Sequence, residues 1–133
     1  MVEAIDIAFL VGRLLFGGFF LMSGLTHITG REQMVPYAES KGIPAPTLAV
    51  VGSGVLLLVG GASVVFGILP TVGLAALVVF LVVVTPSMHD FWNAEDPNEQ
   101  MTEQTQFLKN AALLGAAVAL ATVATPWALS VGV

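Results

Sequence analysis

The sequence predicts an all-α fold: an integral membrane bundle of four antiparallel transmembrane helices. Hydrophobic residues make up 56% of the chain and charged residues only 10%, whereas a soluble domain normally carries about 25% charged residues. Four apolar segments reach the roughly 20 residues that a helix needs to cross a bilayer. Short connections join them, as in antiparallel bundles. The segments are also too long and too uniformly apolar for the strands of a membrane β-barrel.

The four helices are expected within one domain of 133 residues, over 5–28, 45–69, 71–91 and 107–129. We interpret the first as a retained span, because its start is acidic and its apolar run is too long for a cleavable signal. The absence of cysteine excludes disulfides and thiol catalysis. A net charge of −5 without a basic run gives nucleic-acid binding no electrostatic basis.

One stripe of the first helix carries its polar and small residues. The stripe follows helical steps of four and three residues, and it consists of Arg13, Gly17, Phe20, Gly24 and His27. Such a stripe is expected to face the inside of the bundle, which is where any function of the protein should lie.

Arg13 lies about 21 Å from His27 along a helix and therefore in the other half of the bilayer. An arginine at the centre of a membrane helix costs about 2.5–3.5 kcal/mol on insertion scales, so it needs a partner. Asp6 is the expected partner, and the other candidates are Glu3, Thr122 and Thr125. Two interpretations stay open: Arg13 ties helix ends together, or it holds an anionic or carbonyl group of a ligand.

Small residues mark the expected contacts between helices. Residues without bulky side chains let membrane helices approach closely. We expect packing within the chain, rather than a dedicated dimer motif, at Gly17, Gly24, Gly60, Gly61 and Gly115.

Two connections lie at the end of the bundle opposite the termini. In the first, residues 34–38 are expected to form a short interfacial turn. The second is acidic and is expected to be a solvated loop, with a cation site as the lesser alternative; its acidic residues are Glu95, Asp96, Glu99 and Glu103.

The antiparallel topology brings several polar residues to the level of these two connections: His27, His89, Asp90, Lys109 and Asn110, with Thr85 one turn inside His89. Four interpretations stay open. The residues form a polar cap that satisfies itself, or a site for a quinone headgroup or a proton, in which a histidine donates to a quinone carbonyl. The third is ligation of haem b by both histidines. The fourth is a metal site made by the histidines and Asp90.

The segments GRLLFGGFFLMSGLTH, HDFW and FLKNAALLGA, with the glycine-rich second helix, resemble the DoxX family over essentially the whole chain. The resemblance implies a four-helix integral membrane protein. Relatives include DoxD-type subunits linked to thiosulfate:quinone oxidoreduction, and DoxX proteins that scaffold membrane oxidoreductase complexes with soluble redox enzymes. The positions that match the family are Arg13, Gly24, His27, His89, Lys109 and Asn110.

We therefore expect a membrane subunit or anchor of an oxidoreductase system, with quinone as the candidate ligand and a soluble redox enzyme as the candidate partner. The chain is not expected to be an enzyme alone. The alternatives are a non-catalytic scaffold or assembly factor and, below that, an oligomeric carrier of small solutes. The positive-inside rule places the two connections in the cytoplasm, on the charges of Arg31, Lys41 and Lys109.

Overall fold

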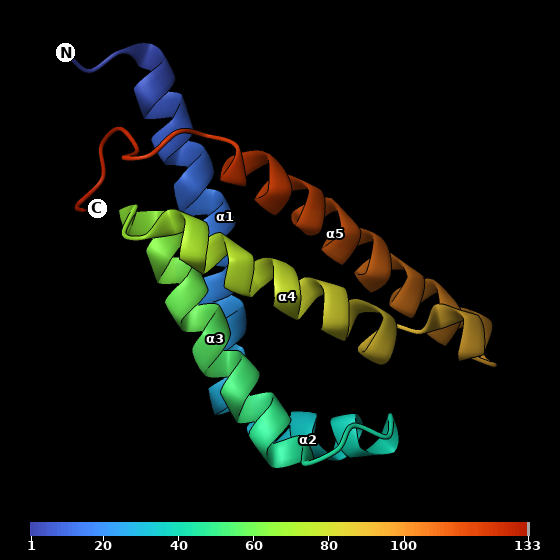
Figure 1. Ribbon diagram of the computed structural model, residues 1–133. Coiled ribbons are helices and arrows are strands. Elements are labelled where there is room, and N and C mark those ends of the chain that lie inside the picture. The colour runs from blue at the N-terminus through green and yellow to red at the C-terminus, as the bar shows by residue number, and fades with distance from the viewer. Residues whose placement is uncertain (133) are drawn as a thin grey trace.

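The computed structural model describes residues 1–132, and every regular element in that range is helical. The elements are α1 (Ala4–Thr29), α2 (Arg31–Ser40), α3 (Pro46–Phe66), α4 (Pro70–Met88), the short 3₁₀ helix η1 (Phe91–Asn93) and α5 (Pro97–Ala121). The four long helices alternate in direction, so that both termini lie at one end of the molecule (Figure 1). We call this the terminus end, and the opposite end, which carries α2 and η1, the loop end.

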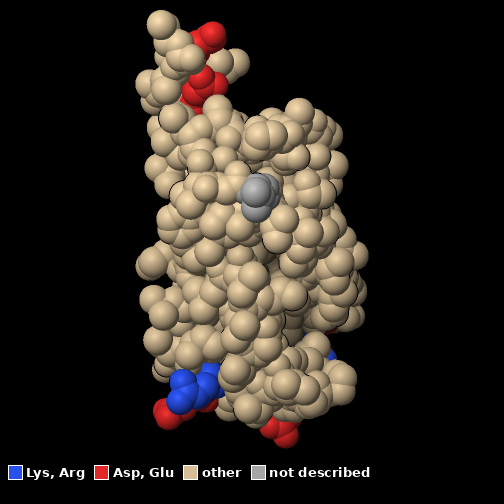
Figure 2. All heavy atoms as spheres, turned by 60° about the vertical axis from the view of Figure 1, so that its left-hand side comes forward, with Lys and Arg blue, Asp and Glu red and all other residues tan. Residues whose placement is uncertain are grey.

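Three helices in residues 1–132 are long and apolar enough to cross a membrane: Ala4–Thr29, Pro46–Phe66 and Pro70–Asn93. In the view of Figure 2, the charged side chains lie at the two ends and the broad surface between them carries none. An uncharged belt between charged ends is what a bilayer requires of a spanning protein. The protein is therefore a multi-pass membrane protein, and its described part contains three candidate spans where the sequence analysis expected four.

α5 differs from its predicted bounds at both ends. It begins at Pro97, ten residues before the expected start, because Asp96 caps it: the Asp96 carboxylate accepts a hydrogen bond from the Asn98 amide at 3.0 Å. Its first turns are consequently polar, which is why α5 is not among the candidate spans. It ends at Ala121 rather than near residue 129, ahead of a proline at position 126 that disfavours helix in the preceding residue.

The turn between α3 and α4 is longer than expected, with residues 67–69 between the two helices. α3 ends at Phe66, three residues before the predicted end, because Gly67 adopts a left-handed conformation with φ of 69°. Pro70 then starts α4 at the helical position where its missing amide costs nothing. α4 ends at Met88 rather than near residue 91, and η1 occupies the residues beyond it.

α1 and α3 form the tightest contact, along glycines of both helices. A Cβ added to Gly17 would lie 2.8 Å from the Gly61 carbonyl oxygen, and one added to Gly24 would lie 2.8 Å from that of Gly54. The two backbones therefore touch directly, as small residues permit in membranes. Gly60 makes the equivalent approach to α4, where an added Cβ would lie 2.8 Å from the Leu77 side chain.

Gly115 of α5 is an exception. A Cβ added there would meet no heavy atom within 4 Å, and Gly115 is exposed. The expectation that it packs within the chain was wrong, because α5 contacts α4 through another of its faces. That face carries the buried residues Glu103, Asn110 and Ala117, which recur every seven residues.

Candidate functional site

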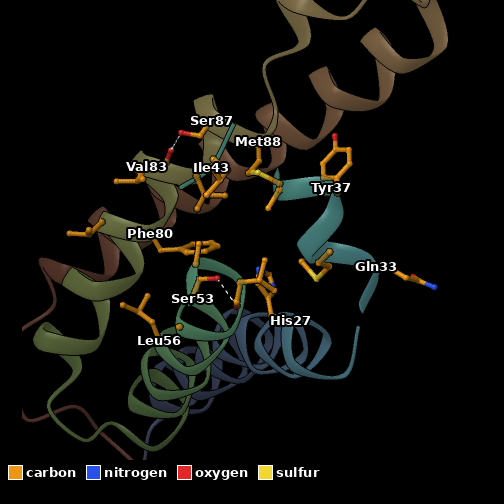
Figure 3. A pocket seen from close by; sticks show the side chains of 17 residues that line it. His27, Gln33, Tyr37, Ile43, Ser53, Leu56, Phe80, Val83, Ser87 and Met88 are labelled. Atoms are coloured by element: carbon orange, nitrogen blue, oxygen red, sulfur yellow. Dashed lines mark hydrogen bonds between the residues drawn. The ribbon is translucent and has the colours of Figure 1, made fainter. Parts of the chain in front are cut away.

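A pocket of about 630 Å³ opens at the loop end, between α2, α3 and α4. Its walls are mostly aliphatic side chains of α3 and α4, with the Phe80 ring on one side. α2 and the turn after it supply the remaining wall through Met34, Tyr37, Ala38 and Ile43. Figure 3 shows side chains from these helices around this space, among them Ser53, Phe80 and Met88, with His27 at the end of α1, whereas Gln33 points away.

His27 is the one residue of the predicted ligand-binding set that lines the pocket. Its Nδ1 lies 2.8 Å from the Ser23 carbonyl oxygen, one turn earlier in α1. A carbonyl oxygen can only accept, so Nδ1 carries the proton in this hydrogen bond and Nε2 of the neutral ring is an acceptor. The Phe80 ring contacts the imidazole edge at a centroid distance of 6.1 Å.

Glu103 of α5 joins three elements at the loop end. It is only 8% exposed. Its Oε1 accepts a hydrogen bond from the Tyr37 hydroxyl at 3.2 Å, and its Oε2 lies 3.2 Å from Nδ1 of His89. The expectation of a solvated loop at Glu103 was therefore wrong: Glu103 lies in helix α5, and its side chain is buried.

The sequence contained a signal for Glu103 that the loop interpretation missed. Asp96 followed by Pro97 and, two residues later, Glu99 is a typical helix start. A helix from that point places Glu103 seven residues before Asn110 and hence on the same buried face.

A second link lies beside the first. Lys41 Nζ donates to Asp90 Oδ1 at 2.6 Å, and the Asn93 amide donates to the other oxygen of Asp90 at 3.1 Å. The hydrogen bond to Asp90 raises the pKa of Lys41 above its ordinary value. Burial, followed by the negative charge of Glu103, raises the pKa of Tyr37. The Tyr37 link fastens α2 to α5, and the Lys41 link fastens the following turn to the α4–α5 connection. Together they hold the α2 wall of the pocket in place.

The five polar residues predicted at this level do not bond one another in residues 1–132. His27 is bonded to Ser23, His89 to Glu103 and Asp90 to Lys41 and Asn93. Lys109 donates to the Gln106 side chain at 2.6 Å and lies over the Phe19 ring. Of the four interpretations, the polar cap is contradicted where it has these residues satisfy one another: an equal depth in the membrane does not place side chains on the same face. Asn110, next to the exposed Lys109, is buried at 6% exposure, and Thr85 at 7%.

Arg13 is fully buried at the other end of α1. Its guanidinium donates to the carbonyl oxygens of Val64 at 3.2 Å, Val65 at 2.9 Å and Ala128 at 2.7 Å. The rings of Phe9 and Trp127 lie 5.6 and 5.4 Å from its central carbon.

Asp6 is not the partner of Arg13, so that prediction was wrong. The Asp6 carboxylate instead accepts from the Glu3 amide at 2.9 Å, at the start of its own helix. The last carbonyls of α3 lack intrahelical partners, and they satisfy the guanidinium in its place.

Within residues 1–132, no group of three or more histidine, cysteine, aspartate or glutamate side chains is arranged to hold a metal ion. The predicted metal set of two histidines and Asp90 is divided between separate bonds, His27 to Ser23, His89 to Glu103 and Asp90 to Lys41.

The chain was also compared with known protein families. A family model described as DoxX matches residues 8–90. The chain belongs to the DoxX family. The matched DoxX region runs from α1 to the end of α4 and so contains every residue that lines the pocket. α5, with Glu103, Lys109 and Asn110, lies outside it. No curated protein and no solved structure matches the chain.

Proposed function

We propose that this DoxX protein is a membrane subunit or anchor of an oxidoreductase system, and that its pocket binds an isoprenoid quinone. The observation that carries the proposal is the apolar pocket at one end of the spanning helices, with His27 in its wall. Its volume of about 630 Å³ lies within the roughly 300–1,000 Å³ typical of small-molecule sites.

The lining suits a ring with an apolar tail. Phe80 offers an aromatic edge, and aliphatic side chains of α3 and α4 line the rest of the space. Because these helices are candidate spans, an isoprenoid chain can extend from the pocket along lipid-facing surface. The proposal keeps His27 as a ligand-contacting residue. Arg13 is not part of it, because backbone carbonyls at the terminus end already hold that side chain.

Filling the pocket tests this proposal. Gly52 lines the pocket, and a Cβ added there would meet nothing within 4 Å, so Gly52→Leu adds bulk to the pocket wall from an unobstructed position. We expect Gly52→Leu to weaken binding of decylubiquinone to the protein in lipid nanodiscs at least tenfold. Gly12→Leu is the matched control, because Gly12 is equally unobstructed and does not line the pocket.

Wild-type protein that shows no saturable binding of benzoquinones or naphthoquinones, and carries none after lipid extraction, would overturn the quinone proposal. Retention of a soluble redox enzyme by the Gly52→Leu variant, together with normal turnover of the complex, would favour the non-catalytic scaffold. Uptake of a small solute by vesicles that contain the purified protein would instead favour the carrier.

We also propose that α5 is a fourth crossing, so that the protein is a four-helix transmembrane bundle in the cell membrane with the loop end in the cytoplasm. The common location of both termini supports an even number of crossings (Figure 1). The basic residues Arg31 and Lys41 lie in and beside α2 at the loop end, which supports this orientation. A soluble redox partner would then approach the loop end.

A further inference from the structure

The polar groups that line the pocket share one property: nearly all of their hydrogen-bond donors are already occupied by the protein. Two thioethers, of Met34 and Met88, can only accept weakly. The other polar side chains in the lining are His27, Gln33, Tyr37, Ser53 and Ser87.

Each hydroxyl in the lining donates its single proton elsewhere. Ser53 donates to the Val50 carbonyl at 3.0 Å and Ser87 to the Val83 carbonyl at 2.7 Å. Tyr37 donates to the Glu103 carboxylate at 3.2 Å. Since a hydroxyl has one proton and two lone pairs, the oxygens of all three remain available to a ligand only as acceptors. Figure 3 draws the bond of Ser87 to the backbone of its own helix.

His27 follows the same pattern. Its Nδ1–H is used on the Ser23 carbonyl at 2.8 Å, which leaves Nε2 of the neutral ring as an acceptor. Gln33 is the exception, because its amide both donates and accepts, but its side chain points away from the other labelled residues in Figure 3. The inner wall of the pocket therefore offers a ligand acceptors without matching donors.

We infer that the pocket selects ligands whose ring carries hydroxyl groups, and hence the quinol rather than the quinone form of a lipid-soluble couple. This inference rests on the proposed function for the identity of the couple, although the preference for a donor holds for any phenol. A quinol donates its hydroxyl protons to His27 Nε2 or to a hydroxyl oxygen of the wall. A quinone presents only carbonyl oxygens, which are also acceptors. Neither these oxygens nor the acceptors of the wall then gain a hydrogen-bond partner.

The proposed hydrogen bond runs from the ligand to His27. This is opposite to the bond expected from the sequence, in which a histidine donates to a quinone carbonyl. A polar group that loses its partner on binding weakens the complex, so we expect the quinol to bind about tenfold more tightly than the quinone. A tenfold preference raises the midpoint potential of the bound two-electron couple by about 30 mV.

A pair of ligands that differ only in the donor tests the inference on the wild-type protein. We expect 4-nonylphenol to bind the protein in nanodiscs about tenfold more tightly than 4-nonylanisole, in which a methyl group replaces the hydroxyl proton. Decylubiquinol and decylubiquinone are measured in parallel under argon. Equal affinities within each pair, as an apolar tail that simply fills the pocket would give, would overturn the inference, and so would tighter binding of the anisole or the quinone.

The two pairs separate this inference from the proposed function. Discrimination between phenol and anisole without binding of either decylubiquinone form would sustain the donor preference and reject the quinone proposal. Binding of both decylubiquinone forms, with equal affinities within each of the two pairs, would sustain the quinone proposal and reject the donor preference.

Variants locate the acceptor. His27→Phe keeps an aromatic ring and removes Nε2, so the ratio of phenol to anisole affinity should fall severalfold. His89→Gln is the control, because His89 bonds Glu103 and does not line the pocket. A ratio unchanged in His27→Phe, in Tyr37→Phe and in Ser87→Ala would show that the wall is not the acceptor.

Discussion

Arg13 is a buried cation. Within residues 1–132, its side chain donates hydrogen bonds to backbone carbonyls rather than to a carboxylate. Carbonyls at the end of a helix carry partial negative charge, and the flanking rings of Phe9 and Trp127 add cation–π attraction. A flat guanidinium with several donors can serve carbonyls of two separate segments at once.

Replacement of Arg13 is therefore expected to destabilise the protein strongly. Arg13→Met should lower the free energy of unfolding by at least about 2 kcal/mol, because several buried carbonyls lose their donor. Arg13→Lys should recover only part of this loss, since an ammonium lacks the planar fork. The measurement is reversible unfolding in mixed micelles of sodium dodecyl sulfate and a mild detergent.

Arg31→Met is the matched control for that measurement. Arg31 is exposed, and within residues 1–132 its side chain bonds the Ile28 carbonyl three residues earlier. Stability of Arg13→Met equal to that of this control would contradict the proposed role of the carbonyl contacts.

The pair α1 and α3 depends on glycines at defined positions rather than on glycine content. Gly17 and Gly18 are adjacent in α1, yet only Gly17 faces α3. A Cβ at Gly17 would lie 2.6 Å from a methyl carbon of Val65 and 2.8 Å from the Gly61 carbonyl oxygen, whereas one at Gly18 would meet nothing within 4 Å.

Alanine at these two positions should therefore have opposite effects. Gly17→Ala is expected to cost about 1–3 kcal/mol of stability, as overpacking does in well-packed interiors. Gly18→Ala should leave stability unchanged or raise it, since alanine favours helix. Unfolding of both variants in the same mixed micelles checks the pair, and equal effects would argue against direct backbone contact.

The attachment of α2 is expected to weaken in alkali. The pKa of Lys41 is held above its ordinary value of 10.5 by Asp90, and that of Tyr37 above 10.0 by burial and Glu103. Both groups are protonated in these bonds, so their stabilising contribution is complete below the ordinary pKa values and is lost as the pH rises through the raised ones.

Limited proteolysis of residues 30–45 checks this expectation. Cleavage should accelerate relative to cleavage elsewhere in the chain as the pH rises above the ordinary pKa values of these two groups. In the double variant Lys41→Met, Tyr37→Phe, cleavage should be fast already at pH 8, and the alkaline increase should be small. A wild-type rate that does not change over this range would contradict the role of the two links.

At the scale of the whole molecule, the proposed topology predicts on which side of the membrane each end lies, and single introduced cysteines can test this. The natural sequence has no cysteine, so each introduced cysteine is the only thiol. Cysteines at positions 2 and 131 should react with a membrane-impermeant maleimide added to intact cells, and cysteines at positions 40 and 95 should react only in inverted vesicles. Reaction of position 131 on the side opposite to position 2 would mean that α5 does not cross.

The sequence predicted the parts of this architecture that depend on local pattern. Apolar length identified three spans, and helical steps correctly placed Arg13, Gly17, Phe20 and Gly24 on the buried stripe of α1. Membership of the DoxX family is confirmed.

What it missed depends on contacts between distant segments. The acceptors of Arg13 lie 51 to 116 residues away, and no periodicity within one helix reports them. The pocket likewise forms only where α2 folds back over α3 and α4, so its lining could not be assembled from four separate helices. The sequence also did not predict that His27 offers an acceptor rather than a donor to the pocket. Its Nδ1 proton is used on a backbone carbonyl, and residue identities do not report such a bond.

The Arg13 contacts also have a consequence for the order in which the protein is made. Arg13 leaves the ribosome long before its acceptors exist, because Val64 follows 51 residues later and Ala128 follows 115 residues later. At about 5–20 residues per second, this means a wait of roughly 6–23 s before Ala128 is made. During that interval the first helix carries a cation whose complete set of carbonyl partners is not yet synthesised.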